Sequence, residues 1–430
     1  EKVKPSLYLS EEGRTKARSY FGIVKQGQPD VYDTPFAKGE STKQLLDSWK
    51  EVLESVRREW PTLWDFENDL ANKVGPMSVM EPLHRRQKDI ESYYTGILLP
   101  GEPIKHSAIA AVMSEWSKLR GLQIRNQQRT VDMMKKSSNS GTPYFSKRRT
   151  VINETIPCEV YGGLKTKQVL PSGLWNAAAI IGWRGQEGGP VKDDVKQRVV
   201  WMFPFAVNVC ELQVYQPLIE AAQRFNLVPA WVSMDEVDRI VTKLFDSKSS
   251  KDPIICTDFE KFDQHFNQNL QAASHELLQG MFKGDSRMRE WLDDVYPIKY
   301  EIPLMVQEDQ IWTGKHGMGS GSGGTNADET LAHRSLQYEA AINSKSKLNP
   351  YSQCLGDDGI LSFPGITVDK VIDSYTMHGL TMNDDKQYES NMDCVYLRRW
   401  HHTNYRIRGI CAGVYSTCRA LGRLRYLERF

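Results

Sequence analysis

Apolar side chains recur along the first half of the chain with spacings that predict mostly helices. The first stretch of about 80 residues is expected to be largely helical, with an amphipathic helix over 41–56 as its clearest segment. Residues 107–136 are expected to be helical, and residues 137–143 are expected to form a loop after them. Strand patterns are expected around Val169 and again over 199–209.

The pattern becomes sharper after residue 253. An apolar run over 253–257 predicts a strand that ends at an acid, and the helical spacing over 270–281 predicts the helix that follows. Residues 314–324 form a glycine-rich loop, after which Thr325 is expected to cap another helix. A hairpin over 355–363, a helix over 367–378 and a strand or hairpin over 393–402 complete the series. This order predicts an α+β fold.

Composition excludes several classes of protein. Hydrophobic residues make up 40% of the 430 residues and aromatic residues 10%, so the chain is expected to fold. No apolar run reaches the roughly 18 residues that a membrane span needs, so no membrane partner is expected. The seven cysteines include no CxxC pair, which predicts reduced thiols and no zinc site. Glu1 follows no basic and apolar leader, so no secretory signal is expected.

The net charge of +1 conceals an alternation of charge along the chain. Residues 115–198 carry 15 basic and 7 acidic side chains, a net charge of +8, and residues 235–301 carry 9 and 14, a net charge of −5. Residues 398–430 carry 8 basic and 1 acidic, a net charge of +7. Ordinary solvated surface explains one such run. The alternation favours an enzyme that holds a polyanion at its edges and divalent cations at its centre.

Asp357 and Asp358 stand side by side at a hairpin tip that a single Asp or Asn would turn equally well. Their mutual repulsion requires a compensating positive charge. Hard divalent cations prefer carboxylate oxygens, and Asp258 at the end of another predicted strand supplies a third carboxylate. The alternative is an ordinary acidic turn, which Gly-Asp-Asp by itself does not exclude.

Three segments resemble motifs A, B and C of the viral RNA-dependent RNA polymerases, most closely those of picobirnaviruses and then partitiviruses. They are Asp258-Phe-Glu-Lys-Phe-Asp263, Ser320-Gly-Ser-Gly-Gly-Thr325-Asn326 and Gly356-Asp357-Asp358. Further segments resemble motifs F, D and E in the expected order, with a weaker match to motif G; they are Lys196-Gln-Arg198, Gly379-Leu-Thr-Met-Asn-Asp-Asp-Lys386, Tyr396-Leu-Arg-Arg399 and Ser140-Gly-Thr-Pro143. The resemblance covers roughly residues 137–400.

The resemblance implies roles for the acids. Asp258 and Asp357 are expected to bridge two Mg²⁺ or Mn²⁺ ions, with Asp358 as an auxiliary carboxylate. Asp263 is expected to sense the ribose 2′-hydroxyl, with either Asn326 or Glu329 as its partner. The sequence leaves that choice open, because Glu329 stands where many relatives carry Asn.

The resemblance also implies roles for basic and loop residues. Lys386 is expected to protonate the departing pyrophosphate as a general acid. Nucleotide contacts are expected from Arg184, Lys196, Arg198, Asp263, Ser320, Thr325 and Asn326. RNA contacts are expected from Gly141, Pro143, Gly321, Arg398 and Arg399. Glycines are expected in the motif B loop because its backbone approaches nucleotide and template, whereas His401 and His402 are expected to be packing or exposed residues.

A right-hand polymerase with fingers, palm and thumb is the implied architecture. The expected divisions are an N-terminal bridge from fingers to thumb (1–80), fingers (81–205), palm with motif A (206–265), a fingers insertion (266–317), palm with motifs B to D (318–395), and motif E with the start of a thumb (396–430). Only 31 residues follow Arg399, so the thumb is expected to be incomplete.

The implied function is RNA synthesis from ribonucleoside triphosphates on an RNA template, for replication and transcription of a double-stranded RNA virus genome. Viral capsid protein is an expected partner, and the virion interior and host cytoplasm are the expected locations. A reverse transcriptase is the first alternative, which Asp263 and Gly356 disfavour. A catalytically silent RNA-binding packaging protein is the second.

Overall fold

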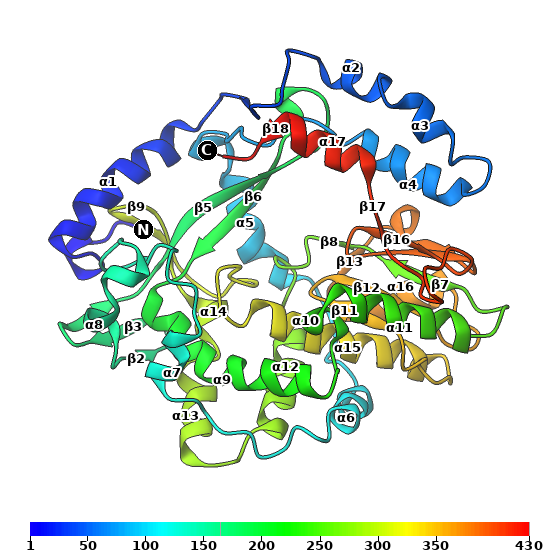
Figure 1. Ribbon diagram of the computed structural model, residues 1–430. Coiled ribbons are helices and arrows are strands. Elements are labelled where there is room, and N and C mark those ends of the chain that lie inside the picture. The colour runs from blue at the N-terminus through cyan, green and yellow to red at the C-terminus, as the bar shows by residue number, and fades with distance from the viewer. Residues whose placement is uncertain (164, 430) are drawn as a thin grey trace.

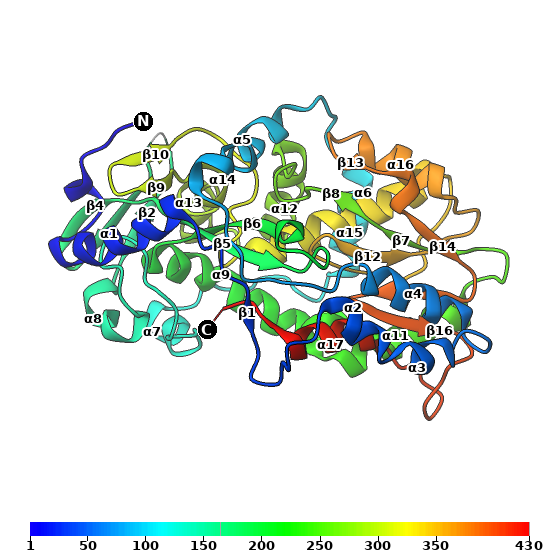
Figure 2. The ribbon, with the colours of Figure 1, turned by 90° about the horizontal axis from the view of Figure 1, so that it is seen from above.

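Two four-stranded sheets organise the computed structural model, which describes residues 1–163 and 165–429. The first, the palm sheet, is antiparallel and runs in the order β11 (Gln353–Leu355), β12 (Asp358–Leu361), β7 (Ile254–Thr257) and β14 (Tyr388–Ser390). Figure 2 shows β7, β12 and β14 at one end of the molecule and the elements α1 (Glu11–Gln26), β4 (Gly173–Asn176) and β10 (Gln310–Trp312) at the other.

The second sheet, the finger sheet, runs in the order β10, β9 (Leu304–Gln307), β5 (Ala179–Gln186) and β6 (Lys196–Met202). β5 and β6 form a long antiparallel ribbon, whereas β5 and β9 run parallel. Helix α1 packs on this sheet because its buried stripe at Ala17 and Phe21 meets Ile180 and Met305.

Helices cover the palm sheet. Helix α11 (Met234–Ser247) packs Val237, Val241 and Leu244 against Ile254 and Ile360. The central helix α15 (Thr325–Asn343) contacts α12 (Gln268–Met281), α6 (His106–Glu115) and α16 (Val368–Thr376), and its side chains are buried along almost the whole of its length. A helix that is buried all round serves as a rigid core element, so the loop that precedes α15 has a fixed base.

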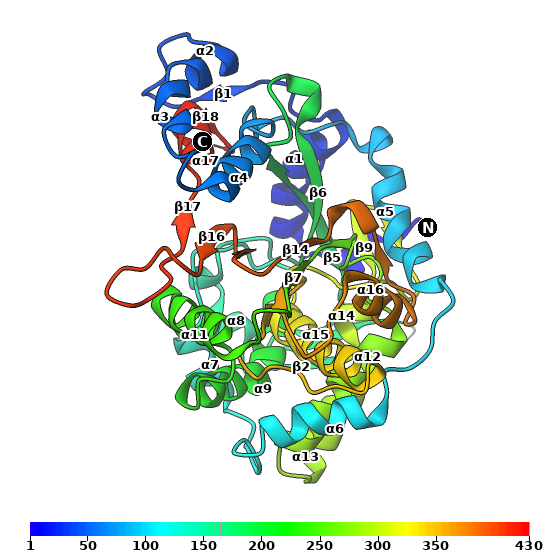
Figure 3. The ribbon, with the colours of Figure 1, turned by 90° about the vertical axis from the view of Figure 1, so that its right-hand side faces the viewer.

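The two ends of the chain meet. Strand β1 (Tyr32–Asp33) pairs with β18 (Tyr426–Leu427), and helix α17 (Thr417–Arg425) contacts α2 (Thr42–Asp47) and α4 (Pro61–Ala71). Figure 1 shows the N-terminal segment arching from α1 over the top of the molecule to α17, and Figure 3 shows α2, α4 and α17 grouped above the palm. The N-terminal segment therefore contacts both the finger sheet and the C-terminal helix, while the domain divisions stay predictions.

Several expected elements are confirmed. The helix over 270–281 is α12, the hairpin over 355–363 is β11 and β12, and the helix over 367–378 is α16. The second hairpin, over 393–402, consists of β15 (Asp393–Tyr396) and β16 (Arg399–His402). In these segments the apolar period and the flanking turn residues agree with the tertiary environment.

Other expectations were wrong in their extent. The helix over 41–56 is interrupted at Trp49, which separates α2 from α3 (Lys50–Glu54). Within 107–136 an irregular stretch separates α6 from α7 (Gln127–Asp132). The strand expected over 199–209 ends at Met202, because Pro204 caps the helix α9 (Phe205–Arg224). A buried apolar run has no period that tells strand from helix.

No helix in the described part of the chain combines the length and the apolar character that crossing a membrane would require.

Candidate active site

The palm sheet brings the separate acidic motifs to one end of adjacent strands. Thr257 lies opposite Gly359 in the antiparallel pair of β7 and β12, so Asp258 and Asp358 lie at the same end of the sheet. Gly356 has φ +58°, in the left-handed region that favours glycine, and an added Cβ there would meet no atom closer than 3.9 Å. Backbone conformation, and not lack of space, therefore favours glycine at the start of the turn.

The Asp258 and Asp357 side chains are solvent accessible and lie within electrostatic range of each other. Partial burial raises the pKa of the Asp357 carboxyl, the negative charges of Asp263 and Asp258 raise it further, and Arg198 opposes them. Burial also raises the pKa of Asp258. A nearby cation stabilises the ionised form of a carboxyl group whose pKa is raised. This pair of acids therefore suits a hard divalent ion.

Asp358 is held differently from the other two acids. Its Oδ2 accepts a hydrogen bond from the backbone N–H of Leu397 at 2.8 Å, and burial raises its pKa to about 7. Among the described residues, no group of three His, Cys, Asp or Glu side chains is arranged to hold a metal ion. The three aspartates thus share one end of the sheet without forming a closed triad. Asp258 and Asp357 are the residues that could hold a cation, with substrate and water supplying other ligands.

Basic side chains surround Asp258. The charges of Lys386, Lys73 and Lys196 each favour its ionised form and oppose the effect of burial. Lys196 in turn has a lowered pKa, because of burial and then the positive charges of Lys73, Arg198 and Lys386. The structure therefore brings together Lys196, Arg198 and Lys386, as expected, and adds Lys73. No motif marks Lys73 in the sequence, so only its position in space could have identified it.

Arg184 lies outside this group. It faces Arg198 across the β5–β6 ribbon, but its Nε donates to Glu428 at 3.1 Å and its side chain is largely exposed. This ion pair joins the ribbon to the C-terminal segment, and the expected nucleotide contact of Arg184 stays a prediction.

Asp263 has Glu329 as its partner. The two carboxyl groups lie within electrostatic range of each other; burial raises the pKa of Glu329 well above its usual range, and the negative charge of Asp263 raises it further. Asn326 instead accepts a hydrogen bond from the indole of Trp231 at 2.8 Å. Of the two partners that the sequence allowed, the structure selects Glu329.

The motif B loop is packed against the chain itself. An added Cβ at Gly321 would lie 1.7 Å from the carbonyl oxygen of Trp201, and one at Gly324 would lie 2.3 Å from the Tyr215 ring. Ser320 Oγ accepts a hydrogen bond from the Trp201 backbone N–H at 3.2 Å. The glycines are therefore required by contact with β6 and α9, whereas the sequence interpretation attributed them to nucleotide and template.

Glu211 on α9 anchors the same loop. Its carboxylate accepts hydrogen bonds from the Ser322 hydroxyl and from the Gly323 N–H, the latter at 3.1 Å. Thr325 is the first helical residue and not the cap, since its Oγ1 donates to the Gly319 carbonyl at 3.1 Å. The loop thus has a fixed conformation. The Ser320 hydroxyl is hydrogen-bonded to the backbone of β6, and the Thr325 hydroxyl is hydrogen-bonded to the backbone of the loop itself.

The residues expected to contact RNA differ in whether they already make contacts within the protein. Gly141 and Pro143 are buried, and the Pro143 carbonyl accepts the Ser10 N–H at 3.0 Å. The Arg399 guanidinium binds both carboxylate oxygens of Asp238. Arg398 has φ +60° and a guanidinium without a hydrogen bond or ion pair in the described part of the chain. Arg398 thus has a guanidinium that is unpaired among the described residues, whereas Gly141, Pro143 and Arg399 make contacts within the protein, and the RNA contacts of all five expected residues, Gly321 included, stay predictions.

Two supporting features escaped the sequence interpretation. Gln387 clamps the backbone of Asp258, because its Nε2 donates to the Asp258 carbonyl and its Oε1 accepts the Asp258 N–H, both at 2.8 Å. A side-chain amide with this double contact fixes the direction of the residue it holds. A lone Gln has no spacing that would reveal the contact.

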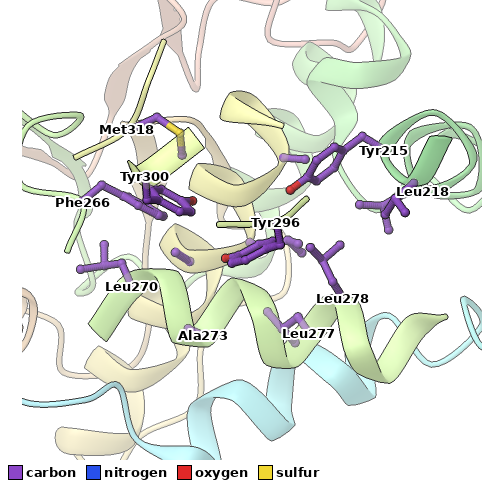
Figure 4. Packing of buried hydrophobic residues seen from close by; sticks show 14 of the residues in the cluster. Tyr215, Leu218, Phe266, Leu270, Ala273, Leu277, Leu278, Tyr296, Tyr300 and Met318 are labelled. Atoms are coloured by element: carbon purple, nitrogen blue, oxygen red, sulfur yellow. The ribbon is translucent and has the colours of Figure 1, made fainter. Parts of the chain in front are cut away.

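The second feature is a buried ion pair at the start of α15. Lys299 Nζ lies 3.0 Å from Asp328 Oδ2, and both side chains are fully buried. The Tyr215 and Tyr300 hydroxyls donate to the same carboxylate, each at 2.7 Å, and Lys299 Nζ lies 3.7 Å from the centre of the Tyr296 ring. Figure 4 shows the three tyrosines within the apolar core beside α12. Such a pair is stable only when fully hydrogen-bonded, as it is here.

Comparison with known proteins agrees with this geometry. The family model of viral RNA-dependent RNA polymerases matches residues 78–408. A potential RNA-dependent RNA polymerase of Human picobirnavirus (strain Human/Thailand/Hy005102/-) is 57% identical over 414 residues, which cover 96% of this chain and 77% of that protein.

Two crystal structures of a human picobirnavirus RNA-dependent RNA polymerase are also similar. The intact polymerase shares 55% identity with a TM-score of 0.98, and the match covers 100% of this chain and 83% of that one. Its insertion-loop deletion mutant has the same identity and TM-score, with 85% of that chain covered. The right-hand polymerase fold is thereby confirmed.

Proposed function

This chain belongs to the viral RNA-dependent RNA polymerases, and on that premise we propose that it copies an RNA template by two-metal-ion phosphoryl transfer from ribonucleoside triphosphates. The enzyme class and the use of RNA and nucleotides follow from the family. The ions, the residue roles and the biological setting are the proposal. The observation that carries it is the pair of accessible carboxylates, Asp258 and Asp357, facing a group of basic side chains.

Asp258 and Asp357 would hold two ions, Mg²⁺ or Mn²⁺. When bound, such ions stabilise the attacking 3′-oxygen and the leaving pyrophosphate oxygen of an in-line displacement. Gln387 fixes the backbone of Asp258, so that its carboxylate keeps one orientation. Asp358 supports the hairpin through Leu397 and would contribute as an auxiliary carboxylate.

Lys196, Arg198 and Lys386 would bind the triphosphate. The charges of Lys196 and Lys386 act on Asp258, and that of Arg198 acts on Asp357. None of the three side chains has an ion-pair partner among the described residues. Charge-assisted contacts to phosphate oxygens are stronger than neutral hydrogen bonds, so these residues would orient the α-phosphate for attack. Lys386 would also donate a proton to the departing pyrophosphate, a step that general acids accelerate by roughly 10²–10⁴-fold.

Asp263 and Glu329 would read the sugar. Burial and the charge of Asp263 favour the protonated form of Glu329, so the pair would offer both a donor and acceptors to a ribose hydroxyl. A site built for a hydroxyl rejects the analogue that lacks it, because its own polar groups then stay unpaired.

The biological setting extends the proposal. We expect replication and transcription of a double-stranded RNA genome inside the virion and in the host cytoplasm, with capsid protein as a partner. The similarity to picobirnavirus polymerases supports this setting.

Incorporation on a defined RNA template tests the proposal. Ribonucleotides should be added only when Mg²⁺ or Mn²⁺ is present, and chelation should stop the reaction reversibly. Deoxynucleotide incorporation at an equal rate would favour a reverse transcriptase. RNA binding without metal-dependent incorporation would favour a packaging protein.

A further inference from the structure

Lys73 lies beside the proposed triphosphate site although it belongs to none of the sequence motifs. It follows the C-terminal end of α4, and its side chain is exposed. In the described part of the chain its ammonium group makes neither a hydrogen bond nor an ion pair. Its charge acts on both Asp258 and Lys196, which places it among the side chains that surround the metal-binding acid.

The segment after Lys73 is fixed to the ribbon that carries Lys196 and Arg198. An added Cβ at Gly75 would lie 1.6 Å from the carbonyl oxygen of Gly189, in the turn between β5 and β6. The backbones therefore touch, and only glycine fits. Gln197 Nε2 donates to the Val79 carbonyl at 2.6 Å. Lys73 consequently keeps a constant distance from the basic residues of β6.

The pocket beside Lys73 holds more positive than negative side chains. Lys73 lines a small pocket between α4, the β5–β6 turn and α17, together with Arg419, Arg423 and Glu187. Arg419 is 9% exposed and its Nε has no hydrogen bond; its nearest carboxylate is Glu187, at 3.6 Å. One carboxylate thus faces three cations. Like charges held together without partners raise the free energy of the folded protein unless an anion binds them.

We propose that Lys73 binds the phosphate tail of the incoming ribonucleoside triphosphate, as a nucleotide-positioning residue contributed by the N-terminal segment. The inference rests on the proposed function, because it assumes that the triphosphate lies against Asp258. The triphosphate fits better than an RNA backbone, since Lys73 shares its location with Lys196 and Lys386 around that acid. The fixed backbone contact at Gly75 supplies the preorganisation that such a contact needs.

The test compares Lys73→Gln with Lys73→Arg and with Lys50→Gln, an exposed lysine on α3 as the matched control. Lys73→Gln should raise KM for all four ribonucleotides about tenfold with little change in kcat, because one charge-assisted phosphate contact is lost. Lys73→Arg should restore KM to within about threefold, since it keeps the charge. Lys50→Gln should leave KM unchanged.

A second measurement separates this inference from the proposed function. Inorganic tripolyphosphate should bind the wild-type protein about tenfold more tightly than Lys73→Gln by calorimetry, a comparison that needs no turnover. Equal tripolyphosphate affinity and equal KM would overturn the role of Lys73. A selective loss of template RNA affinity would overturn it too, in favour of an RNA contact. Absence of incorporation by the wild type would count against the proposed function alone, since tripolyphosphate binding would still decide on Lys73.

Discussion

The carboxyl group of Asp263, in motif A, lies close enough to that of Glu329, on the helix after the motif B loop, for its negative charge to raise the pKa of Glu329. Glu329 is 5% exposed, and its Oε2 has no hydrogen-bond partner in the described part of the chain. The backbone carbonyl of Asp263 also accepts the Met318 N–H at 2.8 Å, which ties the same residue to the loop. Asp263 is therefore fixed against the loop, and Glu329 keeps one carboxyl oxygen without a partner among the described residues.

Replacing either acid of this pair should weaken sugar discrimination. Asp263→Ala and Glu329→Gln should each lower the ratio of ribonucleotide to deoxynucleotide incorporation by roughly tenfold or more, because the carboxyl–carboxyl contact that orients the hydroxyl partner is lost. Single-nucleotide incorporation on one RNA template measures the ratio. Asn326→Ala is the matched control and should leave it unchanged, since Asn326 binds Trp231. The opposite pattern, a change with Asn326→Ala alone, would reassign the sugar sensor.

Asp357→Ala should reduce nucleotide incorporation by at least about 10³-fold, since a proposed metal ligand is lost. Its melting temperature should stay near that of the wild type, because burial already disfavours the ionised side chain. Asp373→Ala, at an exposed position of α16, serves as the control and should keep full activity. Near-normal turnover by Asp357→Ala would remove the metal assignment.

Gly321→Ala should destabilise the protein by about 3 kcal/mol, since its Cβ would lie 1.7 Å from a backbone oxygen that cannot move away alone. Denaturant unfolding measures the loss. Gly284→Ala introduces a Cβ with no atom within 4 Å and should change stability by less than about 0.5 kcal/mol. Equal stability of the two variants would mean that the motif B loop is not held against Trp201.

His401→Asn should make the protein less sensitive to acid. Burial lowers the pKa of His401 to about 4, near Asp238 and Arg399, while its Nδ1 contacts the Cys411 carbonyl at 3.1 Å. Between about pH 6.5 and pH 4 the imidazole of His401 is protonated in the unfolded chain but neutral in the folded chain. The stability contributed by neutral His401 is therefore complete above pH 6.5 and falls as the pH falls.

The asparagine amide can replace Nδ1 as the donor but does not titrate. From pH 7 to pH 5 the wild type should therefore lose about 2 kcal/mol more unfolding free energy than His401→Asn. Parallel pH profiles of the two proteins would mean that folding does not change the proton binding of His401.

Local signals predicted the elements around the acids. The strand before Asp258, the hairpin around Asp357 and the helix α12 follow from short apolar runs, turn residues and a helical period. Boundaries were wrong where the apolar run near residue 200 fits either element, and there Pro204 decided that a helix begins.

Motif residues were predicted more reliably than their contacts. Asp258, Asp357 and Lys386 lie together as expected, because strand pairing follows from alternating patterns that the sequence carries. Arg399 shows the limit: its neighbour Arg398 is free, whereas Arg399 itself is bound to Asp238, 161 residues away in the chain. Adjacent basic residues have the same chemistry, and only the packing of α11 against the β15–β16 hairpin distinguishes them.

By itself, the sequence determined the enzyme family, the acids of the palm and the order of the motifs, since these depend on residue type and local spacing. Only the tertiary structure decided that Glu329 is the partner of Asp263, that the loop glycines fit against Trp201 and Tyr215, and that Lys73 joins the basic group. Those facts depend on distances between segments far apart in the chain. Such distances follow from how the whole core packs, which no local pattern encodes.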